Sequence, residues 1–285
     1  MKPPPFELVR PESLEEALDA LAEHGDEAKP LAGGQSLIPV LNMRLLRPSV
    51  LVDLNRVPGL DGIGRSNGHV SIGALVRQRT LERSSQTREW LPLVAEALPF
   101  VGHVVTRNRG TVGGSVAHAD PAAELPLCLV ALGGTVVAQS REGRREIPVD
   151  EFFVMHFTTT LAPGELLVET RWPVLGEGWG FAFEELAQRH GDYGLSVVAC
   201  ALRVEDERVA EARVALGSVA HRPLLVESGL VGEAVTAARE TGERIAAGLD
   251  LYPNLHASVE YQRHLTAVLV ERAVTRAWRN ACASR

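Results

Sequence analysis

The sequence predicts an α+β protein that is divided into two or three subdomains. Two glycine-bearing segments each precede a helical pattern, and the C-terminal third has three alternating segments followed by helical periodicity. The chain has 285 residues, too many for one small core. We expect subdomains at residues 1–57 and 58–175, followed at 176–285 by a smaller α+β domain with a three-stranded antiparallel sheet plus helices.

The first subdomain is predicted to be a small α-β unit. Its best-defined element is a helix with Ser13 as N-cap and Glu16 at the capping-box position, ended by Gly25. The other predicted elements are strands at 6–9, 29–31 and 50–54 and a short helix at 37–45.

The second and third parts are predicted from the switch between alternating and helical periodicity. The second part has a strand at 69–74, helices from 76, at 91–98 and at 121–132, a hairpin of 135–139 with 144–148, and further segments at 149–153 and 166–172. The third has strands at 179–186, 196–205 and 209–219 and helices at 224–231, 234–249 and 258–282.

Composition excludes several classes of protein. A net charge of -7 argues against a general role at nucleic acids or membrane surfaces, and 5% aromatic residues offer no stacking platform for single strands. No run of 18 apolar residues exists, so no transmembrane segment is expected, and the N-terminus lacks the apolar core of a signal peptide. Cys128, Cys200 and Cys282 form no metal-binding spacing, and their odd number suits a cytoplasmic location.

Two Gly-Gly pairs, at 33–34 and 113–114, carry the functional argument. Adjacent glycines permit positive φ and remove the Cβ atoms that keep a ligand at a distance. Successive N–H groups in such a turn can converge on an anion, usually a phosphate, and hydroxyl side chains add donors. An ordinary turn is the alternative, and we expect one at 133–134. The two segments also bring the hydroxyls of Ser36, Thr111 and Ser115 and the charges of Lys29, Arg107 and Arg109.

Neither segment fits the common nucleotide-binding patterns. The chain has no G-x-x-x-x-G-K-[ST], which excludes a P-loop, and no G-x-G-x-x-G opens a helix after a strand, which weakens a Rossmann interpretation. Two such segments in one chain instead suggest a ligand with two adjoining phosphates, held from both sides.

Both segments resemble the flavin motifs of one family. Residues 31–39 (LAGGQSLIP), with 47–48 and 51–54, resemble the first flavin motif of the medium subunits of molybdenum hydroxylases, and residues 107–115 (RNRGTVGGS), followed by 117–126, resemble the second. The carbon monoxide dehydrogenase medium subunit and the flavin portion of xanthine dehydrogenase belong to this group. The resemblance covers nearly the whole chain. It implies a two-subdomain FAD-binding fold of the vanillyl-alcohol oxidase/PCMH type, with FAD between the first two subdomains.

The resemblance also implies a set of cofactor-binding residues and no catalytic or metal-binding ones. Asp120 and Glu124 would accept hydrogen bonds from ribose or adenine, the alternative being that they cap the helix that begins near Pro121; Glu124 matches a flavin-contacting acid of xanthine dehydrogenase. Leu167 aligns with a residue that lines the cofactor, or is plain core. The remaining implied contacts are Lys29, Leu31, Ala32, Gly33, Gly34, Gln35 (where many relatives have His), Ser36, Leu37, Thr111, Val112, Gly113, Gly114, Ser115, Glu185 and Tyr193.

A third point of resemblance is Gly191-Asp192-Tyr193. The resemblance implies that Tyr193 covers one face of the isoalloxazine ring, where an aromatic side chain stacks and limits access; a surface tyrosine in a turn is the alternative. In the preceding strand, this chain has Glu184-Glu185 where relatives carry a lysine. Because a cation there stabilises the negative charge of the reduced flavin, Glu185→Lys is expected to raise the reduction potential. An unchanged potential in a spectroelectrochemical titration would refute this.

The sequence offers no acid–base pair, metal spacing or iron–sulfur motif, and His118, after the second glycine segment, is either near the cofactor or structural. The resemblance therefore implies an electron-transfer subunit of a heterohexamer, a dimer of heterotrimers. A small 2Fe-2S subunit and a large molybdopterin subunit would be its partners, and NAD, oxygen or quinone its acceptor. The apolar run at 152–157 is compatible with a subunit interface. The alternatives are a stand-alone FAD-dependent oxidoreductase and a scaffold subunit that has lost its cofactor.

Overall fold

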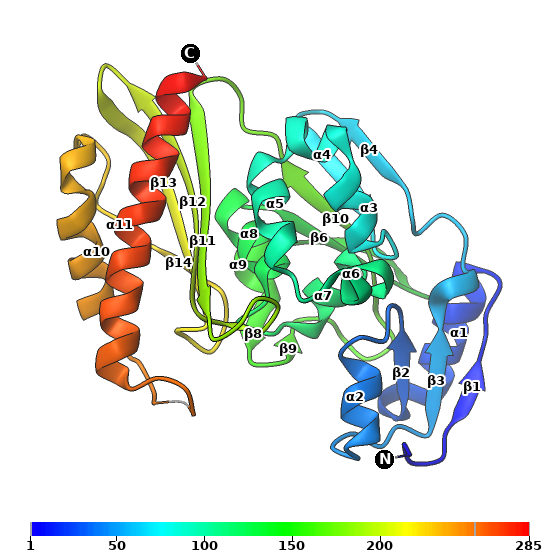
Figure 1. Ribbon diagram of the computed structural model, residues 1–285. Coiled ribbons are helices and arrows are strands. Elements are labelled where there is room, and N and C mark those ends of the chain that lie inside the picture. Colours follow the sequence, from blue (N-terminus) through cyan, green and yellow to red (C-terminus); the bar gives the residue numbers. More distant parts are fainter. Residues whose placement is uncertain (1, 254, 285) are drawn as a thin grey trace.

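A computed structural model describes residues 2–253 and 255–284 and contains three main sheets arranged along the molecule, together with a separate two-stranded hairpin (Figure 1). The N-terminal sheet is parallel, with the strand order β1-β3-β2. The middle sheet is antiparallel, in the order β4-β5-β10-β6-β7, and so is the C-terminal sheet, in the order β11-β12-β13-β14. Within the described ranges, no helix is both long and apolar enough to cross a membrane.

The N-terminal lobe largely follows the prediction. The Oγ of Ser13 accepts the N–H of Glu16 at 3.1 Å, but the Glu16 carboxylate accepts from Glu12 rather than from Ser13, so the capping box is offset by one residue. Gly25 ends the helix with φ 51°. The predicted helix at 37–45 is shorter. The elements are β1 (Glu7–Val9), α1 (Leu14–His24), β2 (Ala28–Leu31), α2 (Leu37–Asn42) and β3 (Val50–Asp53).

The middle sheet is covered on one face by helices whose apolar side chains form the largest core. The helix predicted at 121–132 begins only at Glu124, because Ala119 adopts φ 53° and the Asp120 carboxylate accepts the N–H of Ala122 in a turn. The elements here are β4 (Ile63–Ser66), β5 (His69–Gly73), α3 (Gln78–Arg83), α4 (Ser85–Trp90, not predicted), α5 (Pro92–Ala97), α6 (Val104–Arg109, not predicted), α7 (Val112–His118), α8 (Glu124–Leu132), β6 (Thr135–Ser140), β7 (Gly143–Pro148), α9 (Val149–Phe152), β8 (Phe153–Met155), β9 (Thr158–Thr159) and β10 (Leu166–Pro173).

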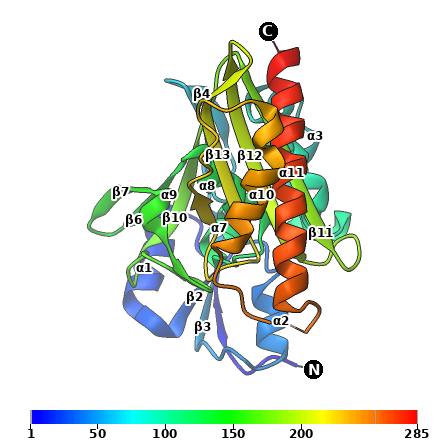
Figure 2. The ribbon, with the colours of Figure 1, turned by 90° about the vertical axis from the view of Figure 1, so that its left-hand side faces the viewer.

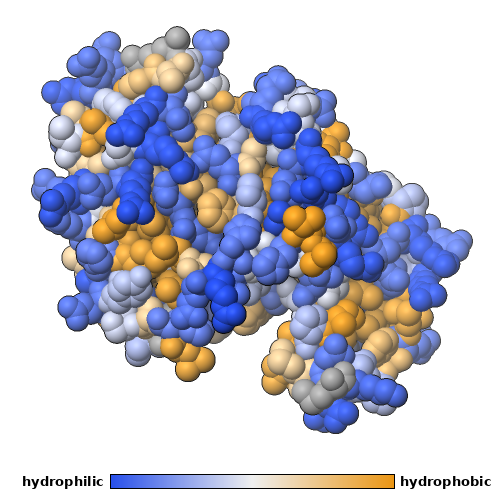
Figure 3. Space-filling model, viewed as in Figure 1, coloured by the Kyte–Doolittle hydropathy of each residue, from blue (hydrophilic) through white to orange (hydrophobic). Residues whose placement is uncertain are grey.

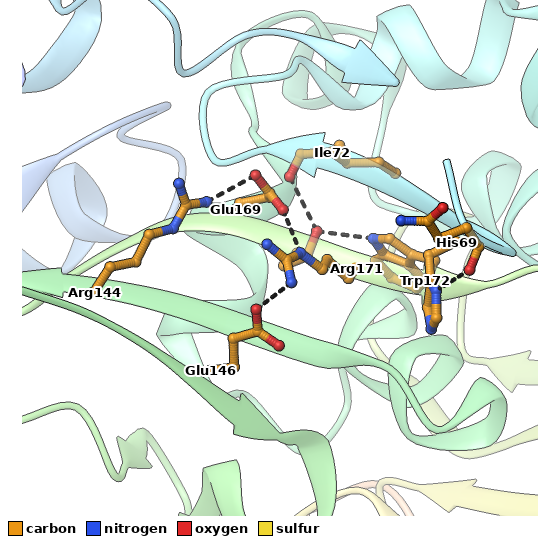
Figure 4. A network of polar contacts seen from close by, with 9 residues as sticks. His69, Ile72, Arg144, Glu146, Glu169, Arg171 and Trp172 are labelled. Atoms are coloured by element: carbon orange, nitrogen blue, oxygen red, sulfur yellow. Dashed lines mark hydrogen bonds and ion pairs between the residues drawn. The ribbon is translucent and has the colours of Figure 1, made fainter. Parts of the chain in front are cut away.

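The helix-free face of this sheet carries a chain of charged side chains (Figure 4). Glu169 on β10 pairs with Arg144 of β7 at 2.9 Å and with Arg171 at 2.7 Å, and Arg171 also pairs with Glu146. On the opposite face, the indole N–H of Trp172 donates to the buried hydroxyl of Thr170. Since the ion pairs are part-exposed, each adds little stability alone, but together they connect β10 with β7 across the intervening strand β6.

The C-terminal sheet has four strands, and the prediction of a helix at 224–231 is wrong. Leu224–Val226 instead pairs with the edge of β13, and three apolar residues are too few for periodicity to distinguish strand from helix. Helices α10 and α11 lie side by side across the outer face of the sheet (Figure 2). The elements are β11 (Trp179–Ala187), β12 (Gly194–Glu205), β13 (Arg208–Gly217), β14 (Leu224–Val226), α10 (Ala238–Ala247) and α11 (Val259–Ala283).

The inner face of this sheet packs on the middle domain. Along β12, Val197 and Ala199 belong to the core of the middle domain, whereas Val198 and Cys200 belong to the core under α11. Arg276 of α11 strengthens the junction through Glu96 of α5. The loop between β11 and β12, which carries Tyr193, therefore projects from a sheet that is fixed against the middle domain.

Candidate cofactor site

The two glycine segments meet in the structure. A Cβ atom on Gly33 would overlap the carbonyl oxygen of Arg109 and lie 2.9 Å from the Cα of Gly110. One on Gly114 would lie 3.6 Å from the Cβ of Ala32. The first segment follows β2 and the second joins α6 to α7, so the glycines permit a backbone approach between separate parts of the chain that any larger residue would prevent. A hollow between the N-terminal lobe and the rest of the molecule is visible in Figure 3.

The first segment exposes a row of free backbone donors. Gly34 adopts φ 72°, and within the described part of the chain the N–H groups of residues 33–36 donate no hydrogen bond. The amide of Gln35 folds back onto the carbonyl of Gly33 at 3.2 Å. Four consecutive unpaired donors beside the start of α2 form an anion-binding arrangement of the kind that holds phosphates.

The second segment is built differently from the prediction. Gly113 and Gly114 lie in the first turn of α7 and have no positive φ, so they do not form a turn. The Thr111 hydroxyl caps this helix by accepting the N–H of Gly114 at 3.0 Å, and the N–H groups of residues 112–115 all have partners within the protein. A Cβ on Gly113 would lie 2.6 Å from the Cα of Ala74. The segment therefore contributes close packing and the half-buried hydroxyl of Ser115, and few free N–H donors.

A brace that joins the two segments was not predicted. The Arg77 guanidinium donates to the carbonyl of Arg109 and to Asn55 Oδ1 at 2.6 Å, and the Asn55 amide donates to the carbonyl of Ala32 at 3.0 Å. Burial lowers the pKa of Arg77, helped by the charge of Arg109. Asn55 and Arg77 lie outside both motifs, and no pattern in the sequence marks them. Only the fold brings them between Ala32 and Arg109.

Arg77→Ala is expected to weaken cofactor binding about 10-fold, because it removes the hydrogen bonds from Arg77 to Asn55 and to the Arg109 carbonyl, which connect the two segments. A charged hydrogen bond of this kind contributes roughly 1.5–3 kcal/mol. Titration of flavin fluorescence would measure the dissociation constant. Arg77→Lys is the matched control: it keeps the charge but cannot reach both acceptors, so an intermediate loss is expected. Equal binding by the alanine variant and the wild type would contradict the brace.

Residues from the N-terminal lobe, the middle domain and the C-terminal domain converge at Tyr193. Tyr193 is 55% exposed, but its hydroxyl end lies beside the side chains of Asp120 and Ser36, which act on its pKa. Burial of that end, together with the neighbouring acids, raises the pKa of Tyr193, so the phenol stays protonated. Its loop also contacts the N-cap of α6, since a Cβ on Gly191 would meet the His103 ring. The predicted residues Ser36, Asp120 and Tyr193 thus form one cluster.

Two acids complete this cluster. Glu124, at the start of α8, is 4% exposed, and burial raises its pKa to about 7. Burial and the charge of Glu124 raise the pKa of Glu185, on β11, to about 8. Its neighbour Glu184 lies apart from the cluster and pairs with Arg276 at 2.8 Å.

Other predicted residues lie further from the cluster. Leu167 and Val112 are buried in the core of the middle domain, and Lys29 is half-buried on β2. Leu31 lies against Gly34, and Leu37 opens α2, so both border the free donors of residues 33–36.

Two side chains have structural roles instead of facing a ligand. Arg107, expected to bring positive charge to the site, is buried in a two-pronged ion pair with Glu82 at 2.8 and 2.9 Å. The His118 ring packs on Phe157 with ring centroids 4.9 Å apart, and burial lowers its pKa, so it is neutral near pH 7. A basic residue beside a glycine motif cannot be assigned to ligand or structure from sequence alone.

The arrangement fits FAD. Free donors suit a diphosphate, the Tyr193 ring suits one face of a flavin, and carboxyl oxygens suit ring or ribose donors. Residues 4–175 match the family described as the FAD binding domain in molybdopterin dehydrogenase, and residues 181–277 match the CO dehydrogenase flavoprotein C-terminal domain. The chain belongs to this flavoprotein family.

Relatives and solved structures agree with this assignment along the whole chain. The subunit is 43% identical to the 6-hydroxypseudooxynicotine dehydrogenase complex subunit alpha of Paenarthrobacter nicotinovorans, over 99% of this chain and 97% of that one. The carbon monoxide dehydrogenase medium chain of Hydrogenophaga pseudoflava is 35% identical over 98% and 99% of the two chains. The structure of carbon monoxide dehydrogenase from that organism superposes with a TM-score of 0.95 at 35% identity, covering 98% of this chain and 99% of that one. Quinoline 2-oxidoreductase from Pseudomonas putida 86 superposes with 0.94 at 36% identity, covering 99% of each chain.

Proposed function

We propose that this flavoprotein subunit receives electrons from a 2Fe-2S small subunit, in a complex whose large subunit carries molybdopterin, and passes them to an external acceptor in the cytoplasm. The complex would be a dimer of such heterotrimers. The observation that carries the proposal is the meeting of the two glycine segments beneath the Tyr193 cluster, in a chain that matches medium subunits along its whole length. The subdomains would be residues 1–57, 58–175 and 176–285.

Each group of residues has a role in this proposal. The N–H groups of residues 33–36 and the Ser115 hydroxyl would hold the diphosphate, and Tyr193 would cover the ring. Bound FAD supplies redox chemistry that can couple one-electron and two-electron partners. No residue of this chain is required as a general acid or base for that transfer.

Exposed apolar residues on the β8–β9 hairpin support a subunit contact. Val154, Met155 and Phe157 are half or more exposed, although Phe152 and Phe153 of the same run are buried, contrary to the expectation for the whole stretch. Apolar side chains that gather on a surface hairpin are typical of an interface.

Purification from the native source tests the proposal. We expect a yellow protein with equimolar FAD that elutes together with two further subunits, one with the absorption of 2Fe-2S clusters and one with molybdopterin. FAD in an isolated chain that oxidises a small substrate would support a stand-alone oxidoreductase instead. A colourless chain within the complex would support a scaffold that has lost its cofactor.

A further inference from the structure

Two poorly solvated carboxyl groups, those of Glu124 and Glu185, lie within electrostatic reach of each other beside the Tyr193 cluster. Glu124 begins α8, and Glu185 projects from β11, so the pair joins the middle and C-terminal domains. Glu185 Oε2 is fully buried and has no hydrogen-bond partner in the described part of the chain. A buried oxygen without a partner is costly unless a proton or a ligand satisfies it.

The groups around this pair supply little positive charge. Asp120, at the end of α7, adds negative charge, and Tyr193 adds a phenol that stays protonated. The thiol of Cys128 on α8 is buried, and its pKa is raised by burial and by Glu124, so it stays neutral. Arg107 is the one cation that acts on Glu124 among the described residues, and its guanidinium is already paired with Glu82. Glu185 has no cation that acts on it in the same part of the chain.

We propose that Glu124 and Glu185 form a coupled acid pair that retains a proton in the cleft, and that FAD binds preferentially to this protonated form. Two neighbouring carboxyls in a poorly solvated site cannot both ionise at low cost. The bound cofactor excludes water from the pair and brings two phosphate charges into the cleft, and both effects disfavour a second negative charge. The protonated carboxyl donates and the other accepts, which suits the alternating donors and acceptors of a flavin ring edge.

The inference rests on the proposed FAD site and has its own test. The dissociation constant of FAD for the full-length apoprotein is measured from pH 6 to pH 9, together with proton uptake by calorimetry in two buffers of different ionisation enthalpy. We expect binding to weaken about 10-fold between pH 7 and pH 9 and to take up protons near pH 8, because binding is linked to one proton. Glu185→Gln, which cannot ionise, is expected to flatten the profile.

The matched control is Glu184→Gln, the same change at the neighbouring residue, which lies apart from the pair and is expected to keep the pH dependence of the wild type. If circular dichroism shows that Glu185→Gln does not fold, Glu124→Gln is used in its place. The measurement of proton uptake uses the wild type alone and does not depend on either variant. FAD affinity that is constant from pH 6 to pH 9, without proton uptake, would overturn the acid pair. Absence of FAD binding at every pH would instead count against the proposed function.

Discussion

Gly33→Ala is expected to weaken FAD binding by about 10- to 100-fold. The added methyl group would overlap the carbonyl oxygen of Arg109, which is backbone and cannot rotate away, so the two glycine segments must separate. Overpacking of this kind costs roughly 1–3 kcal/mol, and each 1.4 kcal/mol corresponds to about a factor of ten in affinity. The substitution lowers the affinity for FAD because the two glycine segments hold one ligand between them.

The measurement is a fluorescence titration of the apoprotein with FAD, accompanied by thermal unfolding without cofactor. Gly64→Ala is the matched control, since that glycine lies on β4 with no heavy atom within 4 Å of the added Cβ and with no positive φ. The control should bind FAD like the wild type. If the Gly33 variant does so too, the segments do not need their close contact to hold the cofactor.

The sequence was a good guide wherever a local pattern determines the structure. Ser13 and Gly25 bound the first helix as their capping chemistry requires, and the alternating segments at 179–219 form three antiparallel strands. The two glycine pairs identified the segments that the fold brings together. Two such segments in one chain suggested that they hold one ligand from both sides, but their direct backbone contact was not predicted, because no local pattern specifies which distant backbones touch.

The predictions from sequence were wrong or incomplete where contacts between distant segments determine the local structure. The pair at 113–114 was predicted to be a turn with free donors, yet it forms a helix whose N–H groups are occupied, because Gly113 must pack against Ala74. Arg107 carries a charge that suits a phosphate, but its partner Glu82 comes from a different helix. Asn55 and Arg77 acquire their role only through distances between separate elements. Spacing along the chain contains none of this information.

The free energy of unfolding of the FAD-free subunit is expected to fall as the pH rises from about 5 to about 8. In the folded state, the pKa values of Glu124 and Glu185 are raised to about 7 and about 8, above the ordinary value of 4.5. Between these limits the native state binds more protons than the unfolded chain, so rising pH favours unfolding. Below pH 4.5 both states are protonated and the effect disappears. One pKa unit corresponds to about 1.4 kcal/mol. Because the two acids are coupled and water can enter the site, their contributions do not add in full. We therefore expect the free energy of unfolding to fall by on the order of 2 kcal/mol over this pH range.

Urea unfolding at intervals of half a pH unit measures this slope. The double variant Glu124→Gln/Glu185→Gln should be nearly flat over the same range, because neither amide titrates. Glu82→Gln is the contrasting control: hydrogen bonds from Arg107 lower the pKa of Glu82, so its contribution is present above pH 4.5 and is lost as the pH falls through its folded-state pKa. That variant should therefore change the acid limb of the stability curve and leave the slope between pH 5 and pH 8 in place. A wild-type curve that is flat between pH 5 and pH 8 would mean that both acids ionise normally in the folded chain, and would contradict the prediction.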